Sequence, residues 1–274
     1  MFKKEKFMSL QVLSMLIALS ALVASVVGLI HPAIYKPLVV DRKVPFIFSQ
    51  DLITIMVVVV FLFIVIGKKM SVKADIARVG IIAYLFYAYG QYVIGTLYNH
   101  LYFLYLAIFS LSIFYLICAF ISIDYEKLEL SMPRPLRIVI ATYCGAMPFI
   151  FAPQWISKIL QSIQANSIPE SDIMFSFNRA VYILDLCLIL PVCVIASVLI
   201  YREKILGLVL GGVLQIKGFT LLLFVALGYI FQPLLFHQTM DLGNVVLYSA
   251  VSFLFLVLTV LYFIYTKVKK SVYN

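Results

Sequence analysis

The chain has 274 residues, of which 64% are hydrophobic and only 12% are charged. Soluble domains contain roughly 45–50% apolar and about 25% charged residues, so this composition excludes an ordinary soluble protein. The apolar residues occur in blocks that are long enough to cross a bilayer as helices. The sequence therefore predicts an integral membrane protein, with the lipid bilayer as its first partner.

We expect an all-α polytopic bundle of about eight transmembrane spans that forms one domain, residues 1–274. The predicted spans are residues 8–30, 50–67, 77–98, 101–123, 136–153, 179–200, 205–231 and 243–266. The first span is too long for the apolar core of a signal peptide. The fifth is short and contains Pro148, so a broken or re-entrant helix and a total of seven spans is the alternative.

Lysine and arginine are distributed unevenly over the segments that join the predicted spans. Fifteen of the 21 fall on the side of the N-terminus and five fall on the other side. This excess follows the positive-inside rule, favours an even number of spans and predicts that both termini are cytoplasmic. We therefore interpret the net charge of +9 as the signal that orients the protein in the membrane. The same lysines and arginines could also bind anionic lipid. We expect no nucleic-acid partner.

The longest segment outside the predicted spans is the outer loop 153–178. Its apolar residues Trp155, Ile156, Ile159, Leu160 and Ile163 recur at helical spacing. This pattern is typical of an amphipathic helix that lies in the membrane interface, where Trp155 would be an anchor at headgroup level. A lid over an outward-facing cavity is the alternative.

Two residues of opposite charge, Asp185 and Lys217, lie inside the sixth and seventh predicted spans. An ionisable group at membrane depth is costly unless it has a partner or water, and it often marks a functional site. A rise of 1.5 Å per residue places Asp185 roughly 9 Å and Lys217 about 12 Å below the outer boundary of a ~30 Å core. The link Tyr201–Lys204 is short, so the two spans are antiparallel neighbours and we expect the two residues to meet.

Further polar residues reach the same level from the third predicted span. Tyr87 and Gln91 lie on one face of that span, and Gln91 is also roughly 9 Å below the outer boundary. We expect an outward-facing ligand or ion pathway formed by Asp185, Lys217, Gln91, Tyr182, Tyr87, Asn99 and His100. The alternative is an Asp–Lys pair that only holds helices together.

The sequence lacks the motifs that would name a reaction. It contains no P-loop, no His-Glu-x-x-His, no Gly-x-Ser-x-Gly and no dinucleotide-binding glycine pattern. We therefore expect no catalytic residues, no cofactor and no metal site, and a non-enzymatic role is favoured. The three histidines fall on the predicted outer side without the spacing of metal ligands.

The stretch from Tyr84 to Phe120 resembles uncharacterised (hypothetical) bacterial multi-pass membrane proteins, as does the run from Tyr182 through Pro191 to Lys217. This resemblance implies a bacterial inner (cytoplasmic) membrane and carries no activity. We expect transport or sensing of a small solute or protons. The alternatives are a membrane enzyme acting on lipid or a lipid-linked substrate, and an accessory subunit of a membrane complex, with the protein partner unknown.

Overall fold

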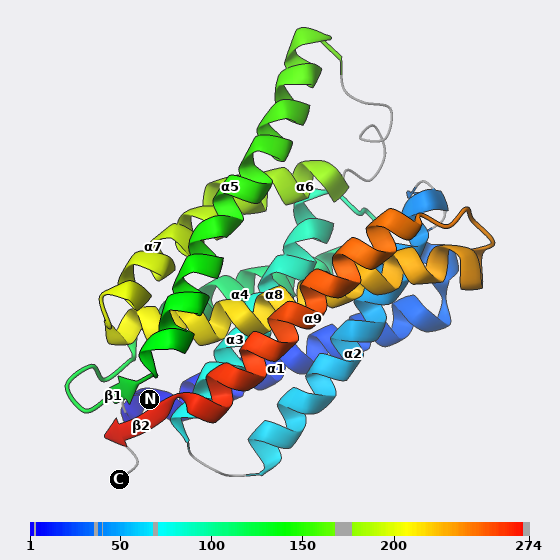
Figure 1. Ribbon diagram of the computed structural model, residues 1–274. Helices are drawn as coiled ribbons and strands as arrows, with labels where there is room; N and C mark the ends of the chain where they lie inside the picture. Colours follow the sequence, from blue (N-terminus) through cyan, green and yellow to red (C-terminus); the bar gives the residue numbers. More distant parts are fainter. Residues whose placement is uncertain (3, 36–37, 40, 68–70, 168–176, 271–274) are drawn as a thin grey trace.

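The structure, a computed structural model, describes residues 1–2, 4–35, 38–39, 41–67, 71–167 and 177–270. In these residues it is all-α apart from one small two-stranded sheet (Figure 1). Seven helices of the described part of the chain are long and apolar enough to cross a membrane, which supports the prediction of a membrane-embedded helical protein. The elements are α1 Lys4–Ile30, η1 Pro32–Ile34, η2 Asp41–Lys43, α2 Val44–Ile66, α3 Val72–Ile94, α4 Tyr102–Ile121, β1 Glu129–Ser131, α5 Arg134–Gln164, α6 Phe177–Leu184, η4 Asp185–Ile189, α7 Leu190–Tyr201, α8 Ile205–Phe236, α9 Leu242–Tyr265 and β2 Lys267–Lys270.

The long helix outside the set of seven is α3, which is more polar because it faces protein instead of lipid. It packs against α1, α2, α4 and α8, and most of its residues are buried. Its tyrosines hydrogen-bond to the surrounding helices: Tyr84 pairs with Thr54 of α2, and Tyr89 donates to the carbonyl of Ala21 in α1. Such bonds hold helices together in a membrane, where lipid gives no hydrophobic drive for their association.

The helices alternate in direction, so the two chain ends lie at one end of the bundle (Figure 1). We call this the terminal end; the far end is where residues 95–101 and 237–241 join helices. At the terminal end Phe2 forms a bridge with Ile123, and β1 pairs antiparallel with β2. This sheet was not expected from the sequence.

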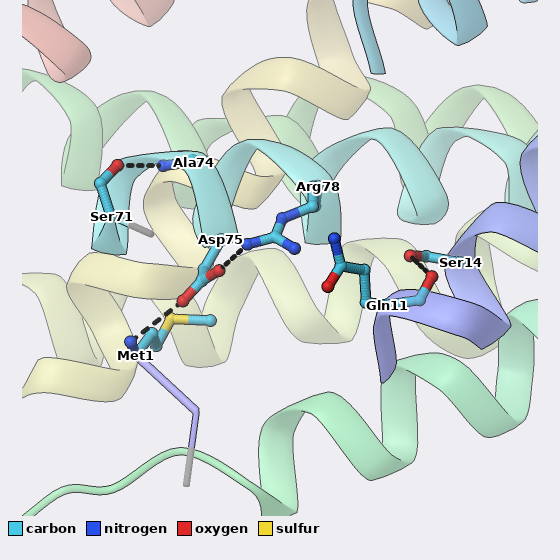
Figure 2. A network of polar contacts seen from close by, with 7 residues as sticks. All are labelled: Met1, Gln11, Ser14, Ser71, Ala74, Asp75 and Arg78. Atoms are coloured by element: carbon cyan, nitrogen blue, oxygen red, sulfur yellow. Dashed lines mark hydrogen bonds and ion pairs between the residues drawn. The ribbon is translucent and has the colours of Figure 1, made fainter. Parts of the chain in front are cut away.

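A buried polar network ties α3 to the terminal end (Figure 2). The amino group of Met1 lies 3.0 Å from Asp75 Oδ2, and Asp75 also forms an ion pair with Arg78 one turn further along α3. Ser71 caps the helix by accepting a hydrogen bond of 3.1 Å from the amide of Ala74. Each buried charge of the network thus has a partner of opposite sign, without which its burial would be strongly unfavourable.

The helix that contains the fifth predicted span is longer than that span. The structure shows one helix of 31 residues, α5, that continues through Pro148 and Pro153 to Gln164. Proline removes one backbone bond, a loss that membrane helices tolerate where neighbouring groups compensate. The predicted amphipathic helix is therefore the last part of α5, which projects beyond the other helices at the far end (Figure 1). The rest of the predicted outer loop, residues 168–176, lies outside the described residues.

The sixth predicted span is divided into α6, the π-helical turn η4 and α7. The wide turn begins at Asp185, and the amide of Leu190 donates to the carbonyl of Asp185 five residues earlier. It stands directly before Pro191, whose ring and missing N–H would disturb a regular α-helix at this point. Turns of this kind are frequent at functional sites in helices.

The central helix α8 packs closely on its neighbours because it carries glycine at the points of contact. A Cβ atom at Gly212 would lie 2.6 Å from atoms of Ile76 and Tyr262, and one at Gly218 would lie 2.3 Å from the ring of Phe255. These contacts bring α8 against α3 and α9 and thereby place Lys217 in the middle of the bundle.

Candidate functional site

A cavity of about 340 Å³ lies between α5 and the central helices, toward the far end. Helices α3, α5, α6, α7, α8 and α9 contribute to its wall, together with residues at the start of α2. Figure 1 shows that α5 and α9 diverge from each other between the β1–β2 sheet at the terminal end and the far end. A volume near the lower end of the usual range for ligand pockets suits a molecule of metabolite size.

Asp185 is held at the cavity wall by two hydrogen bonds. Tyr87 Oη of α3 donates to Asp185 Oδ1 at 2.9 Å, and Trp155 Nε1 of α5 donates to Asp185 Oδ2 at 3.1 Å. The carboxylate is 9% exposed. Three segments that are far apart in the sequence thus converge on one side chain, and each carboxylate oxygen retains room for a second donor.

Lys217 does not pair directly with Asp185, although both belong to the described part of the chain. Its Nζ atom instead lies 3.7 Å from the centroid of the Tyr87 ring, a cation–π contact. Tyr87 therefore stands between the two charges, with its hydroxyl on Asp185 and its ring face on Lys217. The expected contact between the charges is replaced by this bridge.

The ammonium group of Lys217 has no hydrogen-bond acceptor among the described residues. The side chain is only 5% exposed and lines the cavity. Gln91 and Tyr143 also line the cavity, and each has a buried polar atom without a partner in the described part of the chain, Gln91 Oε1 and Tyr143 Oη. Buried polar groups are nearly always hydrogen-bonded to protein or to water in native proteins. The ammonium group of Lys217 is therefore open to a polar occupant of the cavity.

Two further lysines line the cavity nearer the surface. Lys158 of α5 is exposed, and its Nζ lies 5.3 Å from the centroid of the Trp155 ring system. Lys43, at the start of α2, donates to Asn178 Oδ1 at 3.3 Å. Sequence reasoning missed both, because Lys158 lies in the segment predicted as an interfacial amphipathic helix and Lys43 lies in the charged loop before the second predicted span.

Trp155 lines the cavity, a position that was not predicted from the sequence, while its role as an anchor in the lipid interface stays a prediction. Its rings stack near Phe151 and Tyr182, at centroid distances of 6.2 and 5.2 Å. Its indole N–H reaches Asp185 because α5 continues past Pro153 instead of ending there. A helix lying flat in the interface would have carried the ring away from the cavity.

The structure brings most of the predicted pathway residues together. Asp185, Lys217, Gln91, Tyr182 and Tyr87 all line the cavity.

Asn99 and His100 are not part of the cavity wall. Asn99 Nδ2 donates to Tyr105 Oη at 3.1 Å, and its Oδ1 accepts from the amide of Leu101 at 3.0 Å. His100 is exposed at the far end. Both side chains belong to the loop between α3 and α4, so neither lines the cavity, and their part in a ligand or ion pathway stays a prediction. Among the described residues, no three His, Cys, Asp or Glu side chains are grouped as metal ligands.

Comparisons with known proteins find no matching family model, no matching curated protein and no matching solved structure. The resemblance to uncharacterised bacterial membrane proteins therefore stays a prediction from the sequence. What the protein does has to be argued from the cavity itself.

Proposed function

We propose that this protein binds a small polar solute in the cavity and acts in its transport or sensing. The observation that carries the proposal is Lys217, a buried ammonium group that faces the cavity without an acceptor. A buried charge of this kind is strongly unfavourable unless it is paired and hydrogen-bonded. A solute with a matching polar group would supply the missing partner, so the proposal explains why the charge is kept at this depth.

We further propose the orientation of the bundle. All eight long helical passes cross the bacterial cytoplasmic membrane, with the terminal end in the cytoplasm and the cavity toward the outer side. The distribution of lysine and arginine supports this arrangement, and the common position of the two chain ends agrees with it. Single cysteines introduced at Lys127 and at Thr239 test it: an impermeant maleimide added to whole spheroplasts should label only the Thr239 variant.

The two alternative functions explain fewer of the contacts. If the two charged residues only held helices together, we would expect Asp185 and Lys217 to form a direct ion pair, whereas Tyr87 separates them. An enzyme acting on lipid would need room for acyl chains, and about 340 Å³ is small for a diacyl lipid. Protons remain within the proposal, because Asp185 and Lys217 face the same cavity as the solute.

Uptake by proteoliposomes tests the proposed function. The purified chain would be reconstituted and exposed to a defined mixture of small water-soluble metabolites, and the vesicle contents would be measured by mass spectrometry. We expect one or a few compounds to accumulate, or to be retained on the protein if the role is sensing, and Lys217→Met to abolish this. Asn99→Ala, outside the cavity, is the matched control. Neither accumulation nor retention by the wild type would refute the proposal.

A further inference from the structure

We propose that the solute is a small organic anion with an aromatic or other apolar body, bound with its anionic group at Lys217. This inference rests on the proposed function, namely that the cavity holds a solute, and it adds the chemical class.

The charges of the cavity favour an anion. Among the described residues, Lys43, Lys158 and Lys217 line it together with one carboxylate, Asp185. Asp185 already accepts hydrogen bonds from Tyr87 and Trp155, whereas Lys217 Nζ has no acceptor among the described residues. The unmet requirement at Lys217 is therefore for negative charge. A cation bound there would lie beside a like charge.

The position of the lysines gives an anion a path to the deep site. Lys158 is exposed, Lys43 is half-buried, and Lys217 is only 5% exposed. Positive charges along a cleft with low-dielectric walls attract anions and concentrate them there. An entering anion would pass the two outer lysines and exchange its water for the ammonium group of Lys217, which can offer three donors.

The remainder of the wall is suited to an apolar body. Aromatic rings from α5, α6 and α9 line the cavity, among them Phe151, Trp155, Tyr182 and Phe255. Rings stack in offset or edge-to-face arrangements and bind flat apolar groups well.

The headgroup of an anionic lipid offers the same negative charge as a free organic acid. The volume of about 340 Å³ favours the free acid, because a lipid would have to leave its chains outside the cavity. The experiment therefore includes a lipid arm to separate these sources.

The chain carries its own reporter for the test. Trp155 is the single tryptophan among 274 residues, and it lines the cavity with its indole N–H on Asp185. Its fluorescence thus reports on this site alone. The full chain would be placed in nanodiscs of zwitterionic phosphatidylcholine and titrated with benzoate, phenylacetate, benzyl alcohol, benzylamine, phenylalanine and dioctanoyl-phosphatidylglycerol.

We expect a saturable fluorescence change with benzoate or phenylacetate, and no change with benzyl alcohol or benzylamine. Lys217→Met should weaken binding of the acids by about tenfold or more, because a charge-assisted hydrogen bond is lost. Lys217→Arg should keep most of the affinity, and Lys127→Met, at an exposed lysine outside the cavity, should leave it unchanged. Thermal unfolding of each variant would show that it is folded.

Asp185→Asn gives a second signature that a structural role would not produce. Removing the negative charge from the cavity should tighten the binding of the acids several-fold, since the positive excess increases. Loss of affinity in both Lys217→Met and Asp185→Asn would instead indicate that the two residues only hold the helices together and that their substitution distorts the cavity. This result would overturn the proposal.

The remaining outcomes separate this inference from the proposed function. Saturable binding of benzylamine or phenylalanine without binding of the acids would overturn the anionic class and leave a solute site in place. Binding of dioctanoyl-phosphatidylglycerol alone, dependent on Lys217, would assign the anion to lipid and overturn the small solute. No response to either acid would also overturn the inference, while metabolite uptake would still decide the proposed function.

Discussion

Tyr87→Phe is the substitution that tests the geometry of the site most directly. It removes the hydroxyl that donates to Asp185 Oδ1 at 2.9 Å and keeps the ring that lies under Lys217 Nζ at 3.7 Å. A hydrogen bond to a charged group contributes about 1.5–3 kcal/mol. The cation–π contact is unaffected, so the expected loss of unfolding free energy is about 2 kcal/mol.

Reversible unfolding of the purified protein by SDS titration in mixed micelles would measure this change. Tyr201→Phe is the matched control, because that tyrosine is 53% exposed at the end of α7; we expect its effect to stay within about 0.5 kcal/mol. A double-mutant cycle of Tyr87→Phe with Asp185→Asn isolates the bond between them, and its coupling energy should be about 1–2 kcal/mol.

Trp155→Phe should behave in parallel, since Trp155 supplies the second donor to Asp185. The two substitutions together should cost more than the sum of their separate effects, because they leave the carboxylate without either donor. If Tyr87→Phe left the unfolding free energy within 0.5 kcal/mol of the wild type, or if its coupling to Asp185 were zero, Tyr87 would not join the two charges. The description of the site would then be wrong.

Three further predictions concern other parts of the bundle. Gly28→Ala should destabilise the protein by about 1–3 kcal/mol in the same titration, because the new Cβ would lie 2.2 Å from Tyr35 Oη and 2.3 Å from Asp51 Oδ2. Burial, with the charge of Asp51, raises the pKa of Tyr35 well above its usual value, so its hydroxyl stays protonated and donates to Asp51 Oδ2. Ser71→Ala removes the cap of α3 and should cost about 1 kcal/mol of unfolding free energy, whereas Ser71→Asn should restore most of it. Asn99→Ala should lower the free energy of unfolding by about 1 kcal/mol, because a hydrogen bond to Tyr105 is lost. It should leave benzoate binding, monitored by Trp155 fluorescence, unchanged, since Asn99 does not line the cavity. Weaker binding of benzoate would show that Asn99 belongs to the binding site.

The helical membrane architecture could be predicted from the sequence because it depends on local composition. Apolar runs of sufficient length form helices in a bilayer, since every backbone polar group must be satisfied within the segment. The predicted span 8–30 lies within α1 and ends with it at Ile30, and the predicted seventh span begins where α8 begins, at Ile205. The predicted fifth span, 136–153, lies within α5, which continues past Pro153 to Gln164.

The sequence alone also placed Asp185, Lys217 and Gln91 at one level, because helix rise converts residue number into depth. Only the tertiary structure decided how the helices rotate about their axes and how closely they pack. These depend on contacts between distant segments, such as the glycine-mediated packing of α8, and not on local pattern. That packing put Tyr87 between the two charges and brought Trp155 into the site. It also left the ammonium group of Lys217 facing a cavity, because no helix around it supplies an acceptor among the described residues.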